Sequence, residues 1–274
     1  MSYYPRSNSL PSRLHLIISE AEQHLCRLRA SLSTSTPTSS ISHQIFGLQD
    51  LHYCVDPLLQ LFQTQKQSVD ELLNGSLRLL DICSIAKDAL LQTKESVQGL
   101  QSIFRRRRND DVELASEVKK YLNSRKTVKK TIQKALKNLK GLNRQSSSPI
   151  SEEYKSKATT SILKEVDLIT FNVIESLLSL ISGPKASSKL SNWSVVFKLM
   201  QPMKVVYAET NTNEFEKVDA ELSNFIDRKT SKSGNMQNQF KELESNIQDL
   251  EDRLESLMRR LIKTRVSFLN IVNN

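Results

Sequence analysis

The sequence predicts an all-α protein, an elongated bundle of long helices with a coiled-coil-like helix at its C-terminus. Glycine and proline are scarce, at 6 and 7 residues in 274, so few positions can form the tight turns of a many-stranded sheet. Apolar residues make up 38% of the chain and recur at helical spacing. We expect a disordered tail over residues 1–11 and one helical-bundle domain over residues 12–274, with an N-terminal half up to residue 144 and a C-terminal half from residue 145.

The N-terminal half begins with a helix that Ser12 can cap and whose apolar face continues as far as Leu32. The Ser/Thr tract that follows, STSTPTSSIS, has no apolar face and predicts a surface loop. Farther on, Asp56 precedes Pro57 in the pattern of a helix cap and a first-turn proline. This pattern predicts two short helices with a break near Asp56.

A single long helix is predicted from about residue 66 to residue 104, because the apolar positions keep one phase throughout. Gly75 lies inside it, and a helical glycine costs about 0.5–1 kcal/mol relative to alanine. We therefore expect either a weak point or a close approach of another helix at Gly75. The run Arg105–Arg108 suits the C-terminal end of this helix, where cations are favoured, and Asp110 with Glu113 has the spacing of a cap for the next one.

The next helix, predicted over residues 112–140 with Gly141 as its stop, has one apolar and one basic face. Arg125 falls among the apolar positions, where a charge must pair or extend its head to water, so we expect a buried ion pair with a carboxylate. The basic face and the preceding arginines form a candidate basic patch, whose members are Arg105, Arg106, Arg107, Arg108, Lys119, Lys126, Lys130, Lys134 and Lys137.

The C-terminal half is also predicted to be helical. One helix opens near Ser151 and ends at Gly183, because glycine followed by proline stops a helix. A shorter helix surrounds Trp193, the only tryptophan of the chain. Another begins at Asn213, with Glu216 at capping-box spacing.

The last helix has the most regular repeat in the sequence. Its apolar positions alternate steps of four and three, with one threonine among them: Met236, Phe240, Leu243, Ile247, Leu250, Leu254, Leu257, Leu261, Thr264, Phe268 and Ile271. A 3.5-residue repeat is typical of a coiled-coil seam, which requires a partner helix. The spacing leaves open a second copy of the chain as the partner, and we favour packing within the chain's own bundle.

Positive charge is concentrated in one part of the chain. Residues 105–144 contain fourteen Lys or Arg and four Asp or Glu, a net charge of +10 in a chain whose total is +9. A local patch in a nearly neutral protein favours a local anionic partner. Nucleic acid is a disfavoured partner because no base-reading motif accompanies the charge. A nuclear-localisation signal and contact with an anionic membrane surface or an acidic protein are further alternatives for the arginines.

Several segments resemble the plant-specific BYPASS-related proteins: RSNSLPSR, VDELLNGSLRLLDICSIAKD, the RRRR junction, EVKKYLNSRKTVKK, SLLSLISGPK, NEFEKVDAEL and QNQFKELESNIQDLEDRLESLMRRLIKTRVSFLNI. The resemblance covers nearly the whole chain. It implies a plant protein with an all-helical fold and a link with root and shoot development, and it supplies no catalytic or ligand-binding residues to carry over to this chain. We expect a non-enzymatic interaction or scaffold protein, with a basic nuclear or nucleic-acid-associated regulator as the alternative.

The N-terminal tail contains a candidate docking site for a 14-3-3 protein. Arg6, Ser9 and Pro11 have the R-S-x-S-x-P spacing that such proteins bind once the second serine is phosphorylated. A phosphate on Ser9 adds nearly two negative charges for an arginine cluster to bind. The alternative is a disordered tail in which these residue types are merely common.

The sequence gives little reason to expect a metal or a cofactor. His24 with Cys26, and His52 with Cys54, form two His-x-Cys pairs, but helical residues two apart point in nearly opposite directions. Neither pair is therefore expected to bind a metal. No phosphate-binding loop, nucleophile elbow or metalloprotease signature is present in the sequence, so we expect neither an enzyme nor a cofactor.

A membrane span is not expected, because the most apolar stretch, residues 161–182, is interrupted by charged residues that would be costly in a bilayer. The first residues lack the apolar core of a signal peptide, and the three cysteines are widely spaced. These features indicate a reducing compartment, the cytoplasm, with the nucleus as the alternative.

Overall fold

In the computed structural model, the described residues are 10–32, 38–60, 66–106, 111–143, 154–183, 213–228 and 233–273, and they form seven α-helices and no strand. In chain order these helices are α1 (Leu10–Leu32), α2 (Thr38–Gln60), α3 (Lys66–Arg106), α4 (Asp111–Asn143), α5 (Tyr154–Ser182), α7 (Glu214–Arg228) and α8 (Ser233–Asn273). The prediction of an all-α fold is confirmed. The helix expected around Trp193 and the tail over residues 1–9 lie outside the described residues.

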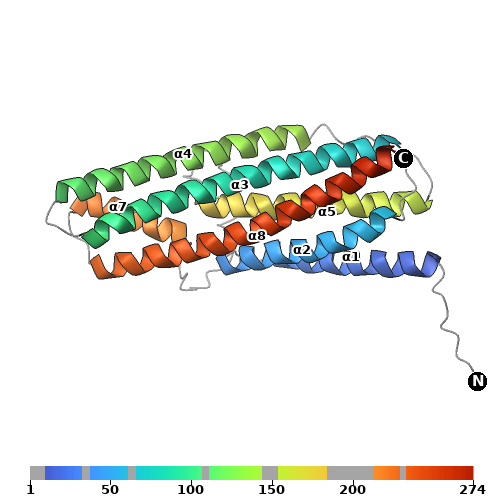
Figure 1. Cartoon of the computed structure of the whole chain (residues 1–274), viewed down its shortest axis with the longest axis horizontal. Coiled ribbons are helices and arrows are strands. Elements are labelled where there is room, and N and C mark those ends of the chain that lie inside the picture. The colour runs from blue at the N-terminus through green and yellow to red at the C-terminus, as the bar shows by residue number, and fades with distance from the viewer. Residues whose placement is uncertain are drawn as a thin grey trace, which may run out of the picture.

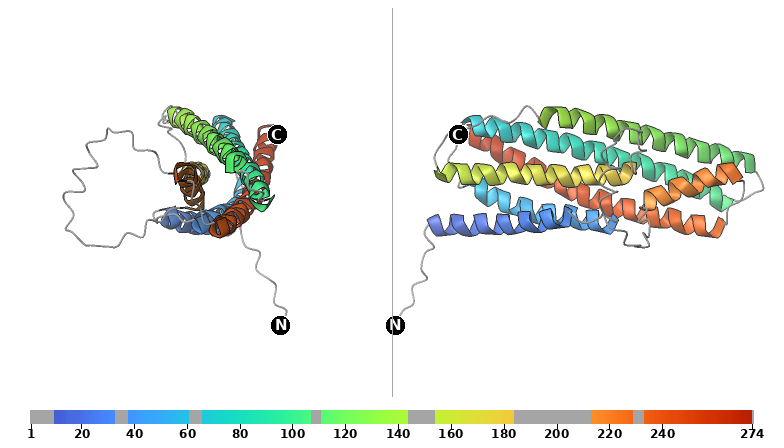
Figure 2. Two further views of the ribbon diagram at one scale, coloured as in Figure 1. Left: turned by 90° about the vertical axis from the view of Figure 1, so that its left-hand side faces the viewer. Right: turned by 180° about the vertical axis from the view of Figure 1, so that it is seen from behind.

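The helices run roughly along one common axis, which makes the bundle elongated (Figure 1). The two longest, α3 and α8, have 41 residues each, so each spans about 60 Å at 1.5 Å per residue. In Figure 2 the bundle is seen along its length and from behind, with α1 at one edge and α4 at another. The prediction of an elongated bundle of long helices is confirmed.

The core lies where the two longest helices meet their neighbours. Helix α3 packs against α8, α4 and α5, while α8 also packs against α2 and α7, and α1 covers α2 and α5. Buried apolar side chains from all seven described helices join in one continuous cluster. Because each helix presents a single apolar stripe, this arrangement removes all the stripes from water at once.

The regular repeat of α8 faces the interior of the same chain. Ten of its eleven positions are buried and Ile271 is half-buried. The partner helices are α3, α2 and α7. Charged residues flank the repeat, and Lys94 of α3 bonds Glu251 of α8 with Nζ and Oε2 2.7 Å apart. The repeat therefore packs within the bundle.

The predicted break near Asp56 is wrong, because α2 is continuous from Thr38 to Gln60 with Pro57 inside it. A proline inside a helix removes one backbone hydrogen bond at a cost of about 3 kcal/mol. Burial of Leu58 and Leu59 beyond the proline compensates, since both are fully packed in the core. Asp56 is not a cap; its carboxylate lies 3.0 Å from Lys263 Nζ of α8.

Helix α2 begins inside the Ser/Thr tract, at Thr38. Two of its hydroxyl groups are buried and donate to carboxylates on distant helices: Thr38 to Glu214 of α7, and Ser42 Oγ to Asp249 Oδ2 of α8 at 2.5 Å. These partners supply the polar contacts that let a tract without an obvious apolar face pack inside the bundle. The loop expected over the whole tract is therefore wrong.

The predicted helix ends differ in their outcome. Gly183 ends α5 in a left-handed conformation, φ 72°, and its N–H donates to Ser179 O at 3.0 Å, as predicted for a glycine stop. Asn213 caps α7, because its Oδ1 accepts from Glu216 N–H at 2.8 Å. Gly141 does not stop α4, which continues to Asn143, so a glycine near the end is tolerated there. Helix α1 begins at Leu10, two residues before the predicted cap.

Candidate functional site

The lysine face of α4 consists of Lys119, Lys126, Lys130, Lys134 and Lys137, and all five are exposed. At 100° and 1.5 Å per residue, they lie within about 80° of arc on one side of the helix and over about 27 Å of its length. Helix α4 lies on the outer side of α3, at one edge of the bundle (Figures 1 and 2). The structure thus brings these residues together as one solvent-facing row.

Acidic partners are found beside other lysines of α4. Lys120 forms an ion pair with Glu117, and Lys129 Nζ lies 2.9 Å from Asp219 Oδ2. By contrast, the lysine face has no ion pair with any carboxylate among the residues that the structure describes. Within the described helices, these five charges are therefore not neutralised by an ion pair.

The arginines of the predicted basic patch are described only in part. Arg105 and Arg106 are exposed in the last turn of α3, and Arg105 Nη2 donates to Gln101 Oε1 at 3.3 Å. Arg107 and Arg108 lie outside the described residues, as do Arg6 and Ser9 of the proposed 14-3-3 site. Pro11 falls in the first turn of α1.

Arg125 lies where α3, α4, α5 and α7 meet, and it is only 2% exposed. Its Nε donates to the Asp219 carboxylate at 3.0 and 3.3 Å, and its Nη2 donates to the same group at 3.2 Å and to Ile181 O at 2.7 Å. Nη1 donates to Thr93 Oγ1 at 3.3 Å. The Phe215 ring faces the guanidinium with its centroid 5.4 Å away. The carboxylate expected from the sequence is therefore Asp219.

The charges around Asp219 fix its ionisation. Burial raises its pKa, but the charge of Arg125 and the hydrogen bonds from Arg125 and Lys129 outweigh that effect, so the pKa lies below its usual range. Tyr121 OH donates to Asp219 Oδ1 at 3.0 Å, and burial together with the nearby carboxylate raises the pKa of Tyr121 well above its usual value. These polar groups bond to one another, so we interpret this cluster as a structural joint between helices.

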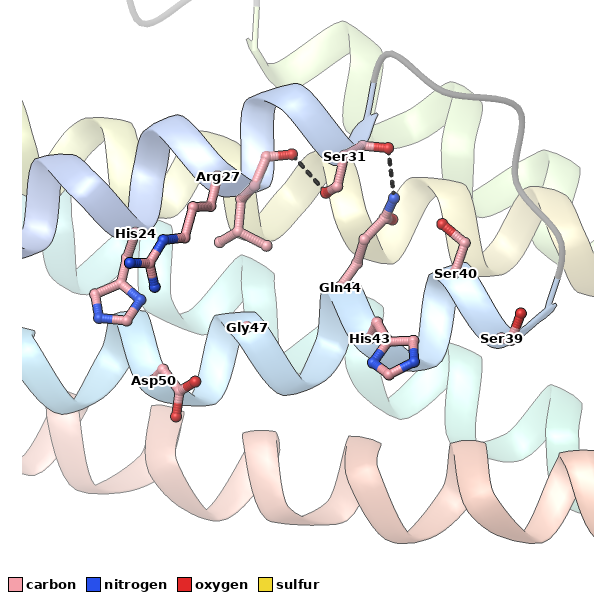
Figure 3. Close-up of a pocket in the computed structure, with 10 residues that line it drawn as sticks. His24, Arg27, Ser31, Ser39, Ser40, His43, Gln44, Gly47 and Asp50 are labelled. Carbon is pink, nitrogen blue, oxygen red and sulfur yellow. Dashed lines mark hydrogen bonds between the residues drawn. The ribbon is translucent and has the colours of Figure 1, made fainter.

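A surface pocket of about 470 Å³ lies between α1 and the first half of α2 (Figure 3). Its polar lining includes His24 and Arg27 from α1 and His43 and Asp50 from α2. Deeper in the wall, Ser31 joins the two helices, because its carbonyl accepts from Gln44 Nε2 at 3.0 Å and its hydroxyl donates to Leu28 O at 2.8 Å. The pocket therefore combines one guanidinium, two imidazoles and several hydroxyl groups with one carboxylate.

His52 is a buried polar residue that the sequence did not single out as a helix contact. It is 1% exposed, and its Nε2 lies 3.0 Å from Thr170 Oγ1 of α5. That hydroxyl donates to Val166 O at 2.7 Å, so it accepts from Nε2–H. Burial, together with the charge of Arg260, lowers the pKa of His52 to about 4, so the ring is neutral near pH 7. Like the Arg125 cluster, it serves the packing of helices.

Gly75 is a point of close helix approach, one of the two roles expected for it. A Cβ added there would lie 2.6 Å from Asp167 Oδ2 of α5. Burial raises the pKa of Asp167 to about 7, against the opposing charge of Arg78, and the charge of Glu71 raises it further. No local motif marks Asp167, because it lies among polar and apolar residues of an ordinary amphipathic helix.

Asp167 is expected to make stability depend on pH. Because the folded state holds this proton more tightly than the unfolded chain, the free energy of unfolding should fall as the pH rises from about 4 to 7. D167N stays neutral, so its free energy of unfolding should exceed that of the wild type by about 1–2 kcal/mol at pH 8 and match it near pH 4. This difference is discounted for solvent screening, because the side chain is partly accessible to water. Urea denaturation at both pH values measures this difference.

The control for that prediction is D88N, which removes an exposed carboxylate from α3. It should change the free energy of unfolding by less than about 0.5 kcal/mol at either pH. An unchanged gap between D167N and the wild type at pH 4 and pH 8 would contradict the role of Asp167.

The fold and the site define an all-α bundle protein with one basic, solvent-facing helix. Residues 44–271 match the family described as Protein BPS1, so the chain belongs to this family. The family agrees with the BYPASS-related resemblance of the sequence motifs and fits a plant development-related protein. Neither the curated proteins nor the solved structures contain a match to the chain. Among the described helices, none is long and apolar enough to cross a membrane.

Proposed function

We propose that this protein is a non-enzymatic helical interaction protein of plant root and shoot development, and that its lysine face binds an acidic surface on a partner protein. The observation that carries the proposal is the row of five exposed lysines on α4, which has no ion pair with the carboxylates of the described helices. We further propose the cytoplasm as its compartment, in keeping with three cysteines that are unpaired in the described helices.

The strength of such a contact can be bounded. An exposed ion pair contributes about 0.2–1 kcal/mol, so five of them supply about 1–5 kcal/mol in total. Charges at an interface act mainly on the association rate and on the choice of partner. The lysine face is therefore proposed to select an acidic partner, whose affinity should fall as salt concentration rises.

The hydrogen bonds of the buried polar groups support the proposal that the protein is not an enzyme. Arg125 and Asp219 bond each other, and His52 bonds Thr170, so these groups hold helices together.

A 14-3-3 protein bound to phosphorylated Ser9 is a separate proposal that rests on the tail sequence. The alternative function, a nucleic-acid-associated nuclear regulator, would use the same lysine face on phosphates.

Charge reversal on the lysine face tests the proposed function. In K126E/K130E, two attractive contacts become repulsive, so binding to the acidic partner should weaken about tenfold. The full chain fused to a proximity-labelling enzyme in root tissue would measure this loss for each labelled protein. The expected result is that labelling of proteins with acidic surfaces falls in K126E/K130E.

The matched control is K217E/K241E, which changes the net charge equally through exposed lysines of α7 and α8. It should leave the labelled proteins unchanged. Equal losses in the two variants would contradict a specific role for the lysine face. Tight binding of the purified chain to a DNA duplex at low salt, lost steeply by 200 mM salt and absent in K126E/K130E, would support the alternative function instead.

A further inference from the structure

A group of three potential metal ligands lies between α1 and α2. Glu20 and His24 are one turn apart on α1, and Cys54 comes from the neighbouring α2. One ligand atom from each residue lies within 4.8 Å of the other two. Cys54 is 6% exposed, His24 is half-buried and Glu20 is exposed, so the group opens from the core towards solvent.

We propose that Glu20, His24 and Cys54 bind a divalent zinc ion that joins α1 to α2. Carboxylate, imidazole and thiolate are all ligands of zinc, and a Zn–ligand distance of 2.0–2.3 Å places tetrahedral ligand atoms roughly 3.4–3.7 Å apart. The present separations require each side chain to move by about 1 Å or less, which a rotamer adjustment supplies. A water molecule completes the coordination on the exposed side.

The site takes one member from each of the two His-x-Cys pairs. Within a pair the two side chains diverge, and the structure places Cys26 on the exposed surface while Cys54 is buried. The packing of α1 on α2 instead brings His24 of the first pair to Cys54 of the second. Neither pair contributes both of its members to this group, so the proposed site arises only from tertiary contact.

The electrostatic surroundings favour a cation at this position. The carboxyl groups of Glu20 and Asp50 both act on the Cys54 thiol, against the single opposing guanidinium of Arg260. The Cys54 Sγ–H makes only a long contact of 3.7 Å with Asp50 O, so no strong hydrogen bond holds the thiol away from a metal. When zinc binds, the thiol proton would pass to solvent and the thiolate would bond the metal.

The position of the site gives it a structural consequence. Helix α1 lies at one edge of the bundle, and its main neighbours among the described helices are α2 and α5 (Figure 2). His24 also lines the pocket between α1 and α2 (Figure 3). A zinc ion would therefore hold α1 in place and fix one wall of this pocket.

Zinc titration of the tag-free, reduced, metal-stripped full chain tests the proposal. With a chromogenic chelator as competitor, we expect one equivalent bound with a Kd of about 1 μM or tighter. Cobalt(II) in place of zinc should give a thiolate charge-transfer band and the visible bands of a tetrahedral ion. Zinc at about 100 times its Kd should raise the Tm by about 3 °C or more.

Substitutions of the ligands assign the site. C54S and H24A should each weaken binding at least about 100-fold, E20Q should weaken it at least about tenfold, and C54S should abolish the charge-transfer band. C26S, which removes the exposed cysteine of α1, is the matched control and should bind as the wild type does. Because Glu20 is exposed, E20Q should fold with the wild-type helicity. This variant therefore still tests the site if C54S, which changes a buried residue, fails to fold.

Three results would overturn the proposal. The first is a wild-type Kd weaker than about 100 μM, which is too weak for a built site of three ligands. The second is a charge-transfer band that C26S removes and C54S leaves intact. The third is wild-type affinity in E20Q together with wild-type affinity in H24A.

Discussion

Replacing Arg125 with methionine is expected to lower the free energy of unfolding by about 3–5 kcal/mol. The substitution keeps a long side chain but leaves the Asp219 carboxylate, 13% exposed, without its main cationic partner. It also leaves Ile181 O and the Asp219 oxygens without the donors that Arg125 provides. Chemical denaturation followed by circular dichroism measures the loss.

K126A is the control for that substitution, because Lys126 is the next residue of α4 and is exposed. It should change stability by less than about 0.5 kcal/mol. In the double variant R125M/D219L the unpaired carboxylate is removed, so the double variant should be more stable than R125M. A loss below about 1.5 kcal/mol in R125M would show that the joint contributes little.

F240A is expected to lower the free energy of unfolding by about 3–5 kcal/mol, because it leaves a cavity in the core. The Phe240 ring of α8 is fully buried and meets Phe104 of α3 edge-on, with centroids 5.4 Å apart. Phe104 in turn lies 6.4 Å from Phe225 of α7, so one aromatic cluster ties three helices. Urea denaturation of the purified variant measures the effect.

The matched control is F46A, because Phe46 is 50% exposed and contacts the Arg253 guanidinium, 5.9 Å from the centre of its ring. Loss of this ring in F46A should lower the free energy of unfolding by less than about 1 kcal/mol. Equal costs for F46A and F240A would contradict the assignment of Phe240 to the centre of the core.

Some of the site was predictable because it depends on one helix only. The lysine face follows from 100° per residue along α4, and the repeat of α8 follows from the same geometry, so both appear directly in the sequence. Arg125 was recognised as needing a carboxylate for the same reason. The identity of Asp219 was not predictable, since it lies 94 residues away and no local spacing connects the two.

Other features were missed because tertiary packing overrides local signals. Asp56 followed by Pro57 has the spacing of a helix start, yet burial of Leu58 and Leu59 keeps α2 continuous. Thr38 and Ser42 lie in a tract whose composition predicts a loop, but carboxylates of α7 and α8 accept hydrogen bonds from their hydroxyl groups. The acceptors of Thr38 and Ser42 lie 176 and 207 residues later in the chain, so no local pattern could reveal them.

The sequence by itself determined the helical class, the two long helices α3 and α8 and the face that each of them buries, because these depend on the spacing of apolar side chains every three or four residues. Only the tertiary structure decided which helices are neighbours. Ionisation of Asp167, the partner of Arg125 and the meeting of Glu20, His24 and Cys54 all depend on that choice. Burial and charge act through space, over a few ångströms, between residues that the order of the chain keeps far apart.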